Sequence, residues 1–175
     1  ANPPVFISTV NPEVRIKVAT NLLHDYGYFN GKVTYETLAD KKDSLKAGIL
    51  YTVDMKNPYF IDTVYYERFT PQTLRIMERG RRYSYISPGE QFNVVDLDDE
   101  RTRISTLLRN RGYFYFRPDY MTYQADTTLV PGGHISLRMI PVPGLPAAAQ
   151  RPYYVGNGSV YLFGKNGESP NDSMM

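Results

Sequence analysis

The stretch of residues 22–29, Leu-Leu-His-Asp-Tyr-Gly-Tyr-Phe, decides how this chain can fold. Its pattern, two leucines followed after three residues by Gly-Tyr-Phe, returns at residues 107–114. In both stretches the glycine, Gly27 or Gly112, is placed to end a helix, because glycine adopts the positive φ that a helix C-terminus commonly needs. Two copies of such a helix end in one chain indicate a repeated structural unit.

Two further matches follow the glycines in the same order, which strengthens the repeat. Val33-Thr34-Tyr35 is matched by Met121-Thr122-Tyr123, and each triplet lies in a segment with the alternating pattern of a strand. Farther along, residues 59–61, Tyr-Phe-Ile, are matched by residues 153–155, Tyr-Tyr-Val. The spacing is 85 residues at the glycines and increases toward the last match, as insertions in loops would produce.

The first copy predicts one helix followed by a β-hairpin. Asn11 is a suitable N-cap, Pro12 fits the first helical position, and an apolar residue recurs every four positions from Val14 to Tyr26. Two alternating strands follow, with a polar turn between them, at residues 32–38, 41–44 and 47–55.

The second copy predicts five elements in the order strand, helix, helix, strand, strand. Ile61 and Val64 in its first strand differ in parity, which indicates a β-bulge or a later start of the strand. Thr70 precedes Pro71 as the cap of the first helix, and Asp96 is placed to cap the second. The five predicted elements are residues 59–68, 70–80, 96–111, 119–124 and 134–140.

These elements predict an α+β fold made of tandem β-α-α-β-β units, each a three-stranded mixed sheet with two helices on one face. The first unit is expected to be truncated, because residues 1–10 lead directly into what would be its second helix. The opening strand of a third unit is expected at residues 153–163, followed by a disordered tail. The predicted division is residues 1–57 for the C-terminal part of a first unit, 58–150 for a complete second unit, and 151–175 for the opening strand of a third unit and the tail.

The chain resembles the POTRA (polypeptide-transport-associated) domains of outer-membrane protein assembly factors of the BamA/TamA type, in the bacterial surface antigen family. The resemblance covers most of residues 12–163. It rests on the two Leu-Leu-x-x-x-Gly-Tyr-Phe helix ends, the aromatic-led strands at residues 59–66 and 153–163, and Ser-Pro-Gly-Glu-Gln-Phe at residues 87–92. The opening at residues 2–6, Asn-Pro-Pro-Val-Phe, is similar to versions from Bacteroides-like bacteria. The family's Gly-Asn in the opening strand occurs here only at residues 156–157.

The resemblance implies a place in the periplasm, ahead of an outer-membrane β-barrel that is not in this chain. It implies that the partners are unfolded outer-membrane proteins or assembly subunits, and that one binding mode is strand addition to a sheet edge. Contact with the membrane surface is a further expectation. An exposed edge offers unpaired N–H and C=O groups to any extended chain. The predicted edge residues are Val33, Thr34, Tyr35 and Glu36 in the first unit, and Tyr120, Met121, Thr122 and Tyr123 in the second.

The composition argues against an enzyme, a metal site and a cofactor. The chain has no cysteine, so thiolate ligands and cysteine nucleophiles are excluded, and its two histidines, His24 and His134, are far apart in sequence. Hydrophobic residues at 42% and charged residues at 22% are typical of a globular protein. No apolar run approaches the roughly 20 residues of a membrane helix. We therefore expect a non-enzymatic interaction module.

The charged residues leave an alternative open. Arg79, Arg81 and Arg82 form the densest basic stretch and suit an anion such as a lipid headgroup, although solvent-exposed helix faces are the simpler interpretation. The acidic run at residues 96–100 fits a helix N-terminus better than a metal site. A net charge of +2 and the lack of a Gly-x-x-Gly between the predicted helices argue against nucleic acid. A generic periplasmic or cell-surface interaction module remains the other alternative.

Overall fold

A computed structural model describes residues 9–40, 46–128 and 132–159 of the chain. Within these ranges the helices and strands form an α+β fold with two separate sheets, which confirms the predicted fold class. The elements in chain order are α1 (Pro12–Asp25), β1 (Lys32–Ala39), β2 (Ala47–Asp54), β3 (Phe60–Tyr66), α2 (Pro71–Arg79), α3 (Val94–Arg109), β4 (Met121–Asp126) and β5 (His134–Pro141).

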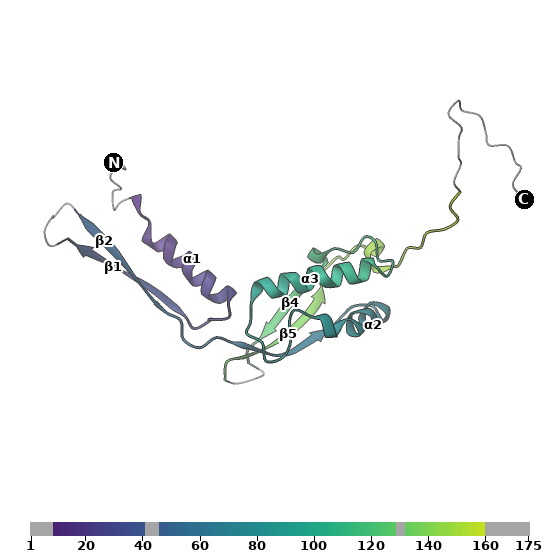
Figure 1. The fold of residues 1–175 in the computed structure, drawn as a ribbon, viewed down its shortest axis with the longest axis horizontal. Helices are drawn as coiled ribbons and strands as arrows, with labels where there is room; N and C mark the ends of the chain where they lie inside the picture. The colour runs from purple at the N-terminus through teal and green to yellow at the C-terminus, as the bar shows by residue number, and fades with distance from the viewer. Residues whose placement is uncertain (1–8, 41–45, 129–131, 160–175) are drawn as a thin grey trace, which may run out of the picture.

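Helix α1 and the hairpin of β1 and β2 make up the first region, which extends away from the remaining elements in Figure 1. Asn11 caps α1 through its Oδ1, which accepts a hydrogen bond from the N–H of Val14, and Pro12 begins the helix as predicted. β1 and β2 pair antiparallel over their whole length. No residue of α1 is buried, and Val33 is the one buried residue of the two strands. The first region therefore has almost no core of its own.

The second region is a complete β-α-α-β-β unit, with β5 in the middle of its sheet. β3 runs parallel to β5 on one side, and β4 runs antiparallel to β5 on the other, so the strand order is β3-β5-β4. Helices α2 and α3 pack together and lie along this sheet (Figure 1). Thr70 caps α2 by accepting a hydrogen bond from the N–H of Thr73, as predicted.

The predicted bulge in β3 determines which side chains reach the core. Ile61 pairs with Ile135 and Val64 pairs with Leu137, so three residues of β3 span the distance that two residues of β5 span. The extra residue brings Ile61 and Val64 to the same face despite their different parity. That face meets the helices in a continuous core, whose most deeply buried members include Ile61, Met77, Ile104, Leu108, Met121, Leu137 and Met139.

The two matched helix ends have the same local structure. The N–H of Tyr28 donates to the carbonyl of Leu23 at 2.8 Å, and the N–H of Tyr113 donates to that of Leu108 at 3.1 Å. The glycine between each pair has a positive φ, 84° in the first copy and 94° in the second. The repeated motif therefore forms the same helix stop in both places.

A later segment of the chain bonds back to each helix end in the same way. Each glycine carbonyl accepts a hydrogen bond from a tyrosine that follows a proline, Tyr59 at 2.9 Å in the first copy and Tyr153 at 2.7 Å in the second. An aromatic ring packs edge-on against each tyrosine with 5.1 Å between ring centroids, Phe29 against Tyr59 and Tyr115 against Tyr153. The hydrogen bond follows the sequence repeat, whereas the packed ring is Phe29 in the first copy and the residue after its match in the second.

Some predicted details differ from the structure. The N-cap of α3 is Asn93, whose Oδ1 accepts from the N–H of Val95 at 2.9 Å, and Asp96 lies inside the first turn instead. Tyr120 belongs to a 3₁₀ turn, Pro118–Tyr120, so β4 begins at Met121, two residues later than predicted. Residues 152–159 form no strand, contrary to the prediction. The predicted turn at 41–44, the first eight residues and residues 160–175 lie outside the described residues.

Candidate functional site

The backbone of β4 presents alternate residues to solvent. The carbonyl of Tyr120 accepts a hydrogen bond from the N–H of Val142 at 3.0 Å, so this position faces β5. In an antiparallel ladder the residues alternate, both N–H and C=O of one residue facing the partner strand and those of the next facing away. Met121, Tyr123 and Ala125 therefore direct their backbone groups outward. Two of the predicted edge residues, Met121 and Tyr123, belong to this outward set.

The opposite edge of the sheet, formed by β3, is covered over its first part. The N–H and C=O of Ile61, the same groups of Tyr59 just before the strand, and the carbonyl of Val64 already have hydrogen-bond partners. The segment before α3 supplies most of them, and an arginine supplies the last. The bonds are Tyr59 N–H to Gly27 O, Phe92 N–H to Tyr59 O, Ile61 N–H to Glu90 O, Gly89 N–H to Ile61 O, and Arg81 Nη1 to Val64 O, all between 2.7 and 2.9 Å. The first part of the β3 edge is therefore blocked to another strand.

The β4 edge is open over its second half. The carbonyl of Met121 accepts a hydrogen bond from Nη1 of Arg101 at 3.3 Å. Tyr123 and Ala125 have no partner for their outward backbone groups within the described chain. The Tyr123 side chain is anchored, because its hydroxyl donates to the carbonyl of Leu97 at 3.1 Å, and burial raises the pKa of this hydroxyl. A fixed strand with a free backbone is therefore available at Tyr123–Ala125.

The β1 edge is open along its length. The N–H of Asp40 donates to the carbonyl of Lys46 at 3.0 Å, which sets the alternation of the hairpin. Val33 and Tyr35 consequently direct their backbone groups outward, whereas Thr34 and Glu36 pair with β2. No hydrogen bond covers the outward groups of Val33 or Tyr35 within the described residues. This edge belongs to the region with almost no core, so it is held less firmly than β4.

The three arginines of the predicted basic stretch have different surroundings in the structure. Arg81 is half-buried and fixed by several contacts: its Nε and Nη2 bind the carboxylate of Glu78 at 2.8 Å, its Nη1 binds Val64 O, and the guanidinium stacks 4.4 Å from the Tyr66 ring centroid. The hydrogen bond to Glu78 raises the pKa of Arg81 further. Arg82 stacks on Tyr83, and Arg79 is exposed. Two of the three arginines thus remain on the surface.

The acidic run at residues 96–100 also separates into distinct structural roles. Asp98 pairs with Arg101 on the surface, whereas Glu100 is completely buried and binds Nε and Nη2 of Arg103 at 2.7 and 2.6 Å. Glu100 also accepts hydrogen bonds from the Tyr66 hydroxyl and the N–H of Tyr85. In the described chain no group of three or more histidine, aspartate or glutamate residues is arranged to hold a metal ion.

The environment of Glu100 stabilises its charged form. Burial raises its pKa, but the hydrogen bonds from Arg103 and Tyr85 outweigh burial and hold the pKa below its ordinary value. Burial and the neighbouring Glu100 raise the pKa of Tyr66 to about 12. Glu100 is therefore a charged structural group, and sequence reasoning missed this role because its partners lie on other elements.

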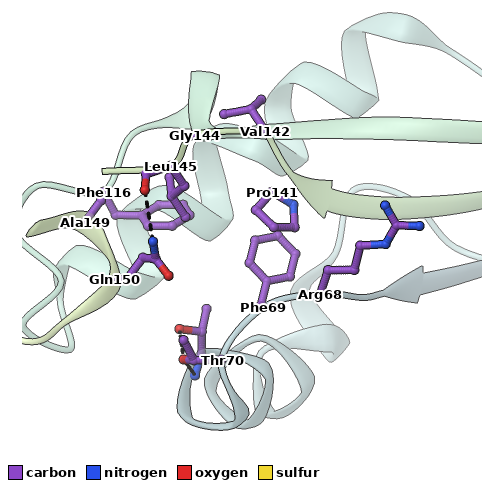
Figure 2. Close-up of a pocket in the computed structure, with 11 residues that line it drawn as sticks. Arg68, Phe69, Thr70, Phe116, Pro141, Val142, Gly144, Leu145, Ala149 and Gln150 are labelled. Atoms are coloured by element: carbon purple, nitrogen blue, oxygen red, sulfur yellow. Dashed lines mark hydrogen bonds between the residues drawn. The ribbon is translucent and has the colours of Figure 1, made fainter. Parts of the chain in front are cut away.

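A cleft of about 450 Å³ lies at one end of the second region, between the start of α2 and the segment after β5 (Figure 2). The ring of Phe69 lies beside Pro141 in this cleft, and Arg68 is the one charged residue among those that line it. The side-chain amide of Gln150 is already bound to the carbonyl of Leu145 at 2.9 Å. The lining residues therefore offer no acid–base pair.

None of the helices in the described part of the chain is both long and apolar enough to cross a membrane. No family model matches the sequence, and no curated protein matches it. Among solved structures, the chain is similar to POTRA domains 3–5 of BamA from Haemophilus influenzae, with 14% identity and a TM-score of 0.46. It is also similar to BamA from Haemophilus ducreyi lacking POTRA domains 1–3, with 13% identity and a TM-score of 0.45. These matches cover 77% and 75% of this chain but only 51% and 23% of the other two.

Proposed function

We propose that this chain is a periplasmic POTRA-type docking region that binds extended segments of outer-membrane protein clients or assembly subunits by strand addition. In this proposal residues 1–57 are the C-terminal part of one unit, residues 58–150 are a complete unit, and residues 151–175 lead into a third. The resemblance carried by the two helix ends and residues 87–92 supports the family. The repeated hydrogen bonds at Gly27 and Gly112 support the division into units.

One observation carries the docking role. The two edges of the sheet in the second region differ: Ile61 in β3 and Tyr59 just before it are bonded, whereas Tyr123 and Ala125 on β4 have no partner for their outward groups within the described chain. A buried Met121 and a Tyr123 anchored to α3 hold the open edge in place. Backbone pairing reads no particular sequence, which suits a receptor for many extended clients.

The experiment uses a synthetic peptide with the sequence of residues 134–141, which already pairs with β4 on its other edge. We expect it to bind the chain, and in NMR spectra to slow the hydrogen exchange of the Tyr123 and Ala125 amides. The Ala125→Pro variant removes one outward N–H, and proline is tolerated on the free side of an edge strand. We expect this variant to fold and to lose peptide binding.

Matched controls separate the two edges. Thr37→Pro removes an outward N–H from β1 and should leave peptide binding unchanged if β4 is the docking edge. An N-methylated copy of the peptide, which lacks the donors for strand pairing, should not bind. Binding that survives Ala125→Pro but is lost in Thr37→Pro would move the site to β1. Binding that survives both variants would contradict strand addition.

A further inference from the structure

Two arginines in the second region have the same unusual arrangement. Arg81 and Arg101 each pair with a carboxylate three residues earlier, Glu78 and Asp98. Each then donates its Nη1 to a backbone carbonyl of an outer strand, Arg81 to β3 at 2.8 Å and Arg101 to β4 at 3.3 Å. The two edges of one sheet therefore carry the same device, supplied by different parts of the chain.

Both of these carbonyls point away from the sheet. The backbone of Ile61 faces away from β5, and the bulge inserts one extra residue after it. The backbone of Val64, three positions later, therefore faces away from β5 as well. Met121 faces outward in β4 by the alternation set at Tyr120. Unpaired outward groups are what makes an edge strand pair with another chain, and native sheets commonly block them with charged side chains. The guanidinium occupies the acceptor that an added strand would need.

The two arginines differ in what lies beside them. On β3, Arg81 binds the carbonyl of Val64, next to the bonded groups of Ile61, so the blocked stretch of that edge runs from its start to the Val64 carbonyl. On β4, Arg101 covers Met121 and leaves Tyr123 and Ala125 uncovered. The charged side chain therefore stands at one end of the open stretch and not across it.

We propose that Arg101 is a positioning residue that limits the docking edge of β4, so that an added strand pairs only with Tyr123 and Ala125. This inference rests on the proposed docking function. It specifies the partner as a short extended segment whose paired backbone ends before Met121. It also assigns Arg81 the role of blocking the Val64 carbonyl, which extends the covered part of the β3 edge beyond Ile61.

The test compares peptide lengths in the wild-type chain and in Arg101→Met, which keeps the aliphatic stem but removes the donors. The probes are the peptide of residues 134–141 and two shorter copies, each lacking two residues at one end. In the wild-type chain we expect one of the shorter copies to bind as tightly as the full peptide, because the two residues it lacks are those that would lie beside Met121, whose carbonyl is already bonded to Arg101. In Arg101→Met we expect the full peptide to bind about 2- to 10-fold more tightly, since one more hydrogen-bonded pair can form.

The decisive result is the dependence on length. In Arg101→Met the same truncation should weaken binding by about the same 2- to 10-fold. Arg79→Met is the matched control, because it removes an equal charge from an exposed site on α2 and should change neither affinity nor length dependence. Asp98→Asn, which releases Arg101 from its carboxylate at an exposed position, should move the length dependence in the same direction by a smaller amount.

The outcomes are distinguishable from those that test the docking function itself. A truncation that costs the same in wild type and in Arg101→Met overturns the role of Arg101 and leaves docking at β4 intact. An equal gain in affinity in Arg79→Met overturns it as well, because net charge would then explain the effect. Absence of peptide binding to every variant overturns the docking function, and this inference with it.

Discussion

The first region and the second region contain the same helix end and the same type of hairpin, but only one of them has a core. Helix α3 buries Leu97, Ile104 and Leu108, whereas α1 buries nothing, and its Val18 is 62% exposed. The second region has what the first lacks in the described chain: a third strand, β3, and a second helix, α2. The comparison shows that the repeated motif specifies the helix stop locally, while burial depends on the added strand and helix.

The largest effect is expected at the buried charge, which the first region does not have. Glu100→Gln leaves Arg103, whose side chain is only 14% exposed, without its carboxylate, and should destabilise the second region by about 3–5 kcal/mol. Arg15 holds the equivalent repeat position in α1 and is exposed, so Arg15→Gln should change stability by less than about 0.5 kcal/mol. Urea unfolding measures both.

The same group gives the second region a pH dependence. Because the pKa of Glu100 is lower in the folded protein than its ordinary value of 4.5, its contribution is complete above that value and is lost as the pH falls through the folded pKa. We expect the stability of the second region to fall below about pH 4.5, with a smaller fall in Glu100→Gln. An identical acid profile in the variant would assign the acid sensitivity to other carboxylates.

An intermediate effect is expected from the paired leucines of the repeat. Leu108 is completely buried, so Leu108→Ala should cost about 2–5 kcal/mol through lost burial and the cavity left behind. Leu23, its counterpart in α1, is half-buried, and Leu23→Ala should cost less than half as much. Equal costs in urea unfolding would mean that the first region has a core comparable to that of the second.

The smallest effect is expected where the two regions are alike. Gly27→Ala and Gly112→Ala each force a side chain into a positive φ, which should cost about 1–2 kcal/mol in both copies. A Cβ would also lie 3.0 Å from the carbonyl oxygen of Phe92 in the first copy and 2.9 Å from that of Tyr153 in the second. Gly48→Ala is the control, because a Cβ there meets nothing within 4 Å. Thermal unfolding that separates the two glycines widely would contradict the repeat.

Features that depend on neighbouring residues were predictable from the sequence. Asn11 and Thr70 cap their helices because the cap needs only an oxygen near the next few N–H groups. The bulge in β3 followed from the parity of Ile61 and Val64. At α3 the same reasoning selected Asp96 over Asn93, since an acidic residue fits both the cap and the first turn and the sequence does not separate the two.

Features that depend on distant residues were not predictable. Glu100 is buried where the hydroxyl of Tyr66 and the backbone N–H of Tyr85 donate to its carboxylate, and nothing in the acidic run distinguishes it from its exposed neighbours. The β4 edge was predicted as a continuous stretch, but the direction of each backbone group follows from pairing with β5. Arg101 reaches Met121 across 20 residues of sequence, so its place at the edge is visible only in the fold.

The hydrogen bonds that Tyr59 and Tyr153 donate to the two glycine carbonyls couple the orientation of each helix to that of a later segment. Gly27 and Gly112 each tie a helix end to a segment much later in the chain, through a bond of 2.9 Å from the N–H of Tyr59 and 2.7 Å from that of Tyr153. A tilt of α1 would therefore move the start of β3, and a tilt of α3 would move the segment at Tyr153. In this way Gly27, which lies outside the proposed docking edge, would influence the direction in which the β4 edge faces.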